Sequence, residues 1–186
     1  MSNNKHTNQT LCNEWAKQIH GSLLTEHLQT SHGTMSVVGS VLYSYSTPIG
    51  HIVGGTTQRW ALLSRNTYSA TTAKQLGNAR RALGYKNYFR VPYIGISGGM
   101  APRVGTYSIE QMHNANMLSF TTAYNNACNK LARPSRPSSY LMAVQRTDSL
   151  IELYTTCVQY AEAFGLALEI SLPFVDNSAI SLTGKM

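Results

Sequence analysis

Residues 35–64, MSVVGSVLYSYSTPIGHIVGGTTQRWALLS, decide the fold class of this chain. The first part of the stretch is rich in valine, isoleucine and tyrosine, and such β-branched and aromatic side chains favour the pleated surface of a sheet. Pro48 indicates an edge or a turn, because proline cannot donate a hydrogen bond to a neighbouring strand. Gly54 and Gly55 supply a turn, after which residues 59–64 are predicted to return as a strand. The stretch therefore predicts a hairpin or a short meander.

A short helix is predicted directly after these strands, over residues 73–83. Thr72 and Gln75 have the spacing of a capping box, in which each side chain satisfies a free backbone donor of the other residue. Gly84 suits the left-handed position just past a helix end. Leu76 and Leu83 share the side that docks on the rest of the protein. The opposite, outward side carries Lys74, Asn78 and Arg81.

The flanking regions predict further helices and strands. Apolar residues at helical spacing predict an amphipathic helix over residues 11–29, interrupted by the poor helix former Gly21. Residues 88–96 read as a strand with an edge-type proline at Pro92, and residues 166–172 as a last strand.

Two more capping boxes are expected in the C-terminal half. Ser108 with Gln111 opens a helix predicted to reach residue 131, and Ser149 with Glu152 opens one predicted to end before Gly165. Residues 132–139, ARPSRPSS, connect the two helices.

These elements predict an α+β fold, with a small antiparallel sheet of three to five strands packed with three to four helices. At 186 residues the chain is expected to form a single domain. We place that domain at residues 11–175, with a basic centre at 59–103 and a helical C-terminal half. Residues 1–10 are expected to form a disordered lead, and residues 176–186 a loose tail.

The placement of charge is more informative than the net charge of +7. No Asp or Glu occurs between Glu26 and Glu110, and eight Lys and Arg residues lie in that interval. A field of one sign attracts polyanions, of which nucleic acid is the commonest. Two alternatives remain open: a solvated basic face neutralised by the acidic segment after Asp148, and an acidic protein partner.

Neither a metal centre nor a catalytic site is indicated. The three cysteines are far apart, and the six histidines show no H-x-x-x-H or H-E-x-x-H spacing. Glu110 and His113 are neighbours on a predicted helix, but no nucleophile is marked beside them, and we interpret both as solvated surface residues. Residues 95–99, GISGG, lack the lysine of a phosphate-binding loop. We expect a non-catalytic protein without a cofactor or metal.

No membrane association or export is expected. No stretch approaches the roughly 18 apolar residues that span a bilayer, and residues 1–10, MSNNKHTNQT, do not resemble a signal peptide. Cys128 and Cys157 fall on apolar helix faces, where a free thiol behaves as a small hydrophobe, and this favours a reducing compartment.

Basic and aromatic residues alternate in the central segment. Cationic groups neutralise phosphates, and exposed rings can stack on unpaired bases, although many aromatic residues of strands are part of the core. The aromatic residues are Trp60, Tyr68, Tyr85, Tyr88, Phe89 and Tyr93. The predicted nucleic-acid-binding residues are Arg59, Lys74, Asn78, Arg80, Arg81, Lys86 and Arg90.

The central segment also resembles a known group of proteins. LYSYSTPI at 42–49, WALL at 60–63, YSATTAKQ at 68–75 and ARRAL at 79–83 look like a small module of uncharacterised bacteriophage-encoded proteins. The resemblance covers residues 42–84 only and implies a phage origin. It carries over no functional residue. The positions similar to the module are Tyr68, Ser69, Thr71, Thr72, Gln75 and Arg81.

Together these features predict a phage accessory protein that binds nucleic acid non-catalytically in the host cytoplasm, through the basic side of the helix at 73–83. One alternative is an anti-defence inhibitor that binds a host protein complex. Another is a minor component of the virion.

Overall fold

The computed structural model describes residues 6–22, 24, 27–84, 87–95, 108–132 and 140–170. Within these residues a six-stranded sheet is covered by four α-helices and one 3₁₀ helix, which confirms the α+β prediction. The sheet is larger than the three to five strands predicted, and its last pair of strands is parallel rather than antiparallel.

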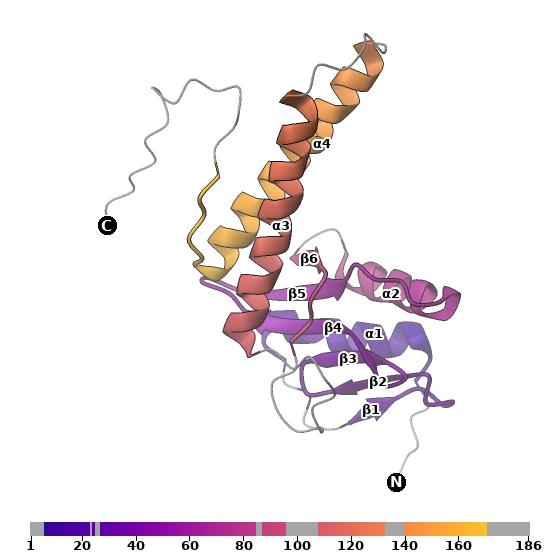
Figure 1. Ribbon diagram of the computed structural model, residues 1–186. Helices are drawn as coiled ribbons and strands as arrows, with labels where there is room; N and C mark the ends of the chain where they lie inside the picture. The colour runs from indigo at the N-terminus through magenta and orange to yellow at the C-terminus, as the bar shows by residue number, and fades with distance from the viewer. Residues whose placement is uncertain are drawn as a thin grey trace.

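The strands follow one another across the sheet in sequence order. They are β1 (Leu28–Gln29), β2 (Met35–Val38), β3 (Val41–Ser44), β4 (Thr47–Gly54), β5 (Arg59–Ser64) and β6 (Tyr88–Val91). The first five pair antiparallel. β5 and β6 are parallel, because α2 (Ala70–Leu83) carries the chain back between them (Figure 1).

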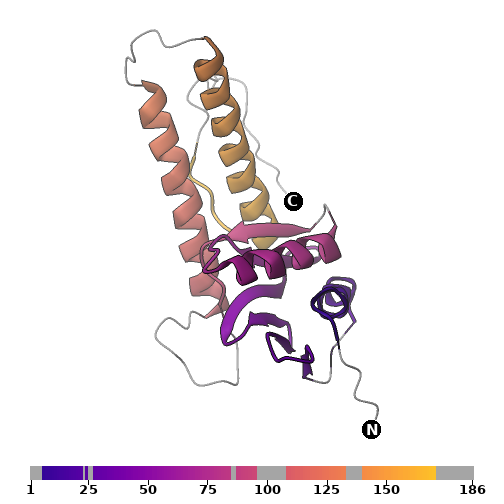
Figure 2. The same cartoon turned by 90° about the vertical axis from the view of Figure 1, so that its right-hand side faces the viewer.

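The helices form one layer on each face of the sheet. α1 (Asn8–Ala16), continued by the 3₁₀ helix η1 (Lys17–His20), lies beside α2 on one face. α3 (Ile109–Ala132) and α4 (Tyr140–Phe164) form an antiparallel hairpin that packs on the other face and extends well beyond the sheet (Figures 1 and 2). No helix of the described ranges is long and apolar enough to cross a membrane.

The alternation of side chains in the strands divides the protein into two cores. Ala61 and Leu63 of β5 face the α1/α2 layer, whereas Leu62 between them faces the α3/α4 layer. This is the period of two expected of a strand with both faces covered.

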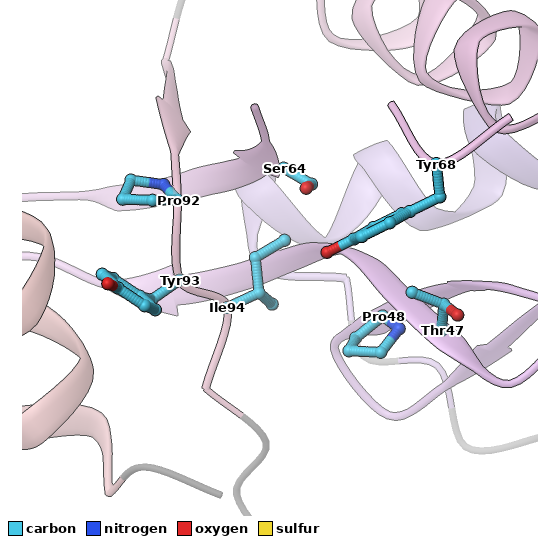
Figure 3. Close-up of a pocket in the computed structure, with 7 residues that line it drawn as sticks. All are labelled: Thr47, Pro48, Ser64, Tyr68, Pro92, Tyr93 and Ile94. Atoms are coloured by element: carbon cyan, nitrogen blue, oxygen red, sulfur yellow. The ribbon is translucent and has the colours of Figure 1, made fainter. Parts of the chain in front are cut away.

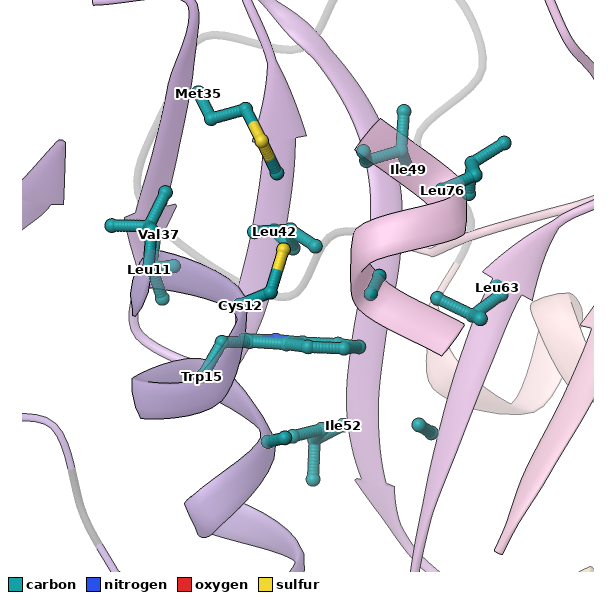
Figure 4. Close-up of a cluster of buried hydrophobic side chains, with 13 residues drawn as sticks. Leu11, Cys12, Trp15, Met35, Val37, Leu42, Ile49, Ile52, Leu63 and Leu76 are labelled. Atoms are coloured by element: carbon teal, nitrogen blue, oxygen red, sulfur yellow. The ribbon is translucent and has the colours of Figure 1, made fainter. Parts of the chain in front are cut away.

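The core under α1 and α2 is mainly aliphatic and surrounds Trp15. Figure 4 shows the indole between Cys12 and Ile52. Its Nε1 donates a hydrogen bond to the Ser40 carbonyl at 2.9 Å. Gly50 makes room for the ring, because a Cβ there would lie only 2.9 Å from Trp15 Cζ2. Burial raises the pKa of the Cys12 thiol to about 12, so it is packed as a hydrophobe.

The core under α3 and α4 is mainly aromatic. Tyr160 of α4 lies at its centre, with its ring centroid 5.0 Å from Phe89 and 5.1 Å from Phe120. Both pairs meet edge to face, the arrangement that the quadrupoles of the rings favour. Phe89 comes from β6, so this contact joins the helical hairpin to the edge of the sheet.

The N-terminal helix is shorter and begins earlier than predicted. It begins at Asn8, inside the expected lead, because the Thr7 side chain caps it. The prediction of a helix as far as residue 29 is wrong, because Gly21, at φ +93°, ends the 3₁₀ turn. Leu28 and Gln29 belong instead to β1.

The strand-rich segment contains more turns than predicted. Pro48 does not mark an edge or a turn but lies inside β4, opposite Tyr43, where the register of β3 and β4 shifts. The strand at 59–64 is confirmed. The strand predicted at 88–96 ends at Val91, and the described residues after it, up to Gly95, are not a strand.

The C-terminal helices confirm one capping box and contradict the other. Ser108 N donates to Gln111 Oε1 at 2.9 Å and Gln111 N donates to Ser108 Oγ at 3.1 Å, as predicted. α4 begins at Tyr140 rather than at Ser149, so the second box lies inside a helix. Residues 166–170 do not form the predicted strand. Residues 1–5, 133–139 and 171–186, which include the predicted tail, lie outside the described residues.

The turn between β4 and β5 holds the end of α4. The backbone N of Thr56 donates to the Ala163 carbonyl at 2.8 Å, and its Oγ1 donates to the Glu162 carbonyl at 3.1 Å. Gly55 permits this approach, since a Cβ there would meet the Ala163 oxygen and lie 2.7 Å from Trp60 Cδ1. The last carbonyls of a helix have no partner within it, and here the turn supplies two donors.

Candidate nucleic-acid interface

Helix α2 is central to the predicted binding surface, and its N-terminus differs from the prediction. Ser69 is the N-cap, so the helix begins three residues early, and Ser69 Oγ accepts from Thr72 N at 3.1 Å. Thr72 is buried 3.4 Å from Ser44 Oγ. Gln75 closes no capping box and donates instead to the Thr34 carbonyl at 3.1 Å. Residues of the motif YSATTAKQ at 68–75 therefore cap α2 and pack it against the sheet.

The outward side of α2 is basic, but Asn78 does not belong to it. Lys74 and Arg81 are exposed, whereas Asn78 is half-buried against α1. The Asn78 carbonyl accepts from Gln9 Nε2 at 3.4 Å, and Arg81 Nη1 donates to Gln9 Oε1 at 2.9 Å and to Asn78 Oδ1 at 3.1 Å. Asn78 is thus part of the α1–α2 contact, which is formed by residues far apart in the sequence.

Arg80 lies on the flank of α2 away from α1. Successive helical residues turn by about 100°, so Arg80 points away from the direction of Asn78. α2 lies between α1 and β6 in Figures 1 and 2. Arg90 is exposed on β6, and Arg65 is exposed just after β5, with its backbone N bonded to the Val91 carbonyl at 2.8 Å. The structure thus brings Arg65 and Arg90 together at the β5/β6 edge of the sheet, and Arg80 is exposed on α2.

A groove of about 590 Å³ separates the β6 edge from α4. Arg65 and Arg90 line it from the sheet, and Glu152 lines it from α4. The charge of this groove is therefore mixed.

Two predicted residues are not part of this surface. Arg59 is half-buried at the start of β5, where its Nη1 donates to the Gln18 carbonyl of η1 at 3.1 Å. It ties η1 to the sheet, at the opposite end of β5 from Arg65. Lys86 lies outside the described residues.

Acidic side chains do not neutralise the cations of α2 in the described ranges. The ion pair found there joins Lys17 Nζ to Glu14 Oε1 at 2.8 Å, on α1. The described carboxylates of α4 belong to the layer on the other face of the sheet (Figure 2). Among the described residues, neutralisation by the acidic C-terminal segment, one of the alternatives above, is therefore not seen for Lys74, Arg80 and Arg81, and Asp176 lies outside these residues.

The aromatic residues of the central segment divide into core and surface. Trp60 and Phe89 pack in the aromatic core with ring centroids 4.8 Å apart, and Tyr88 packs against the aliphatic core. Tyr68 and Tyr93 are 64% and 40% exposed. Tyr85 lies outside the described residues.

Tyr68 and Tyr93 line the same small pocket, which we call the tyrosine pocket. Its volume is about 140 Å³, and the start of β4 (Thr47 and Pro48), Ser64 at the end of β5 and residues 92–94 after β6 complete it. Figure 3 shows Tyr68 reaching across from the loop before α2 toward the segment that carries Tyr93. The carboxyl ends of parallel strands commonly form ligand sites, and β5 and β6 are such a pair.

A buried polar network lies behind this pocket. Asn116 of α3 is fully buried and bonds both polar groups of the Tyr93 backbone. Asn116 Oδ1 accepts from the Tyr93 N at 3.0 Å, and Asn116 Nδ2 donates to the Tyr93 carbonyl at 2.9 Å. Nδ2 also donates to Tyr160 Oη at 3.1 Å, and that hydroxyl lies 2.9 Å from His113 Nδ1. The network fixes the backbone of Tyr93 against the helical hairpin.

Two buried histidines belong to this region. His51 is 2% and His113 6% exposed, so the interpretation of His113 as a solvated residue is wrong, while Glu110 is exposed. Desolvation lowers the pKa of His51 to about 4, and desolvation together with the charge of His51 lowers the pKa of His113 to about 4. His51 Nδ1 is buried without a hydrogen-bond partner. Among the described residues no group of three or more His, Cys, Asp or Glu could hold a metal ion.

Sequence reasoning missed the buried network because its members lie on three separate elements. Tyr93, Asn116 and Tyr160 are 23 or more residues apart, and no local spacing reveals such contacts. The tyrosines of the pocket, in contrast, belong to the aromatic set that the sequence singled out.

Comparison of the chain with protein-family models, with curated proteins and with solved structures gives no match. The function proposed for this chain therefore rests on its own residues.

Proposed function

We propose that this protein binds nucleic acid non-catalytically through the outward side of α2. The supporting observation is the exposure of Lys74, Arg80 and Arg81 on one helix without a carboxylate partner in the described ranges. These cations lie in the part of the chain between Glu26 and Glu110, which contains no Asp or Glu. Exposed cations of this kind bind phosphates and release the counterions condensed on them.

The proposal includes a phage accessory role in the host cytoplasm, on the resemblance of residues 42–84. The proposed contact surface consists of Lys74, Arg80 and Arg81 on α2, extended by Arg65 and Arg90 at the β5/β6 edge of the sheet. Asn78 and Arg59 are omitted, because both are half-buried and bonded within the protein. Arg81 is kept, because it is exposed although its Nη1 also bonds Gln9 and Asn78.

A salt titration tests the proposal. Binding to a labelled 12-nucleotide strand and to a 12-base-pair duplex is measured from 50 to 200 mM salt. Three phosphate contacts predict a slope of log K against log salt of about −2 for a single strand and about −3 for a duplex. Lys74→Glu and Arg80→Glu are each expected to weaken binding and to reduce the slope by about one.

Lys130→Glu is the matched control, because Lys130 is an exposed lysine at the end of α3 and changes the net charge equally. Its affinity is expected to stay close to that of the wild type. Equal losses in Lys74→Glu and Lys130→Glu would indicate attraction by net charge alone, and no binding at 50 mM salt would overturn the proposal.

A further inference from the structure

We propose that the tyrosine pocket binds an unpaired base, so that the ligand of this protein is single-stranded nucleic acid. The inference rests on the proposed function and specifies its ligand. The exposed ring of Tyr68 stacks on the base, while the cations of α2 bind the phosphates that follow it. Tyr93 contributes to the wall of the pocket, and its ring points away from Tyr68 (Figure 3).

The exposed rings are the first support. Tyr68 and Tyr93 are among the few large apolar side chains exposed in the described ranges, and both line one pocket. Most sites for small molecules have volumes of roughly 300–1,000 Å³. A pocket of about 140 Å³ instead suits one planar ring system. Base–aromatic stacking needs only an accessible π-face and tolerates any base sequence.

Hydrogen bonds hold the backbone of Tyr93 and of the loop that leads to Tyr68, which is the second support. Asn116 holds the N and O of Tyr93 at 3.0 and 2.9 Å. Before Tyr68, the Asn66 N donates to Ser64 Oγ at 3.1 Å, and that Oγ donates to the Asn66 carbonyl at 3.3 Å. Little order has to be gained when a base binds, and such preorganisation favours affinity.

The position of the cations relative to the pocket is the third support. Arg65 is in the loop that carries Tyr68, and Thr71, Lys74 and Arg81 are exposed along α2 at helical spacing. From its first residue to Arg81, α2 rises about 16 Å. One stacked strand places about five phosphates over that length. A strand can therefore lie along α2 with a base in the tyrosine pocket.

Charge distinguishes this ligand from an extended proline-rich peptide, which also binds to aromatic surfaces. Arg65, three residues before Tyr68, and Lys74, on the helix that follows it, are exposed and offer phosphate partners, and none of the described residues that line the pocket is acidic. A duplex is disfavoured, because its paired and stacked bases cannot enter the pocket.

The test distinguishes the contribution of the bases to binding from the contribution of the phosphates. Wild-type protein is titrated with labelled dT12, with rU12, with a 12-nucleotide strand whose bases are all replaced by abasic sites, and with a 12-base-pair duplex. We expect dT12 or rU12 to bind roughly five- to hundredfold more tightly than the abasic strand. The two base-bearing strands distinguish DNA from RNA as the source of the base.

Substitutions then locate the effect. Tyr68→Ala is expected to abolish the difference in affinity between dT12 and the abasic strand while leaving the salt slope unchanged. Tyr68→Phe is expected to keep this difference in affinity, because the ring is retained. Tyr45→Ala is the control, since Tyr45 is 58% exposed but does not line the pocket. Circular dichroism verifies that each variant is folded.

Three outcomes overturn the inference while leaving the proposed function intact: equal affinity of the wild type for dT12 and the abasic strand, tighter binding of the duplex, or an equal loss of both strands in Tyr68→Ala. Tyr68-dependent binding of a proline-rich peptide with no base effect would assign the pocket to peptide instead. If no nucleic acid binds at 50 mM salt, the proposed function fails and the inference fails with it.

Discussion

The two faces of the sheet are covered by layers of opposite character. Under α1 and α2 the core is mainly aliphatic around Trp15, and the outer surface of α2 carries cations. Under α3 and α4 the core is aromatic and encloses His51, His113 and Asn116, and the exposed charges of α4 include Glu152 and Glu162. Exposed charge and buried polarity are thus separated, and the tyrosine pocket lies where the two layers meet.

The largest effect is expected from breaking the aliphatic layer at its centre. Trp15→Ala removes the largest side chain of that core and its hydrogen bond to Ser40. We expect the free energy of unfolding to fall by about 3–5 kcal/mol, measured by urea denaturation. Trp15→Phe should lose less, because most of the buried ring area remains. A loss below about 1 kcal/mol would show that α1 contributes little to the fold.

Acid should destabilise the protein through the α3/α4 layer. His51 and His113 are neutral in the folded protein, with pKa values near 4, whereas the unfolded chain takes up protons near pH 6.5. Stability is therefore complete above pH 6.5 and is lost as the pH falls from 6.5 toward 4, by about 3 kcal/mol for each histidine.

His51→Leu isolates this effect. The variant loses the hydrogen bond between the His51 ring and the Gly95 backbone, but Nδ1 has no partner to lose. It is expected to fold and to show a smaller fall in stability between pH 6.5 and 4. Denaturation curves at pH 7, 5.5 and 4.5 measure it. His32→Leu, at an exposed position outside this layer, is the control and should keep the wild-type pH dependence. An unchanged pH dependence in His51→Leu would contradict the prediction.

A smaller effect is expected where the two layers meet. Asn116→Leu leaves the N and O of the Tyr93 backbone without their partner, and we expect a loss of about 1–3 kcal/mol in the free energy of unfolding. Because Tyr93 is then less fixed, the preference for dT12 over the abasic strand should also decrease. Asn125→Leu, at an exposed position of the same helix, should change neither quantity.

The smallest effect concerns the start of α2. Ser69→Ala removes the cap to Thr72 N and should cost about 1 kcal/mol, measured as a lower melting temperature. Ser69→Asp preserves an acceptor at the cap and should restore most of this loss. Equal melting temperatures for wild type and Ser69→Ala would contradict the assignment of the N-cap.

Local features of the fold could be predicted from the sequence, whereas long-range features could not. The strand at 59–64 and the capping box of Ser108 and Gln111 depend on neighbouring residues, and both are confirmed. The parallel pairing of β5 and β6 depends on how α2 packs, which no local pattern encodes. The start of α4 was misplaced because Ser149 and Glu152 have capping-box spacing although they lie inside a helix.

The candidate site shows the same division. Exposure of Lys74, Arg80 and Arg81 followed from the cost of burying unpaired charge. That Asn78 belongs to the α1–α2 contact rather than to the basic surface could not be predicted, because its partner Gln9 is 69 residues away in sequence. The pairing of Tyr68 with Tyr93 in one pocket likewise depends on the parallel arrangement of β5 and β6.

The two hydrogen bonds that Thr56 donates to the last carbonyls of α4 fix the position of that helix along its axis. A slip of α4 by one residue would move each of its side chains by about 1.5 Å and rotate it by about 100°. Tyr160 would then lose its place beside Asn116, whose other bonds hold Tyr93. A tight turn at one end of the sheet thus sets the alignment on which the geometry of the opposite end depends.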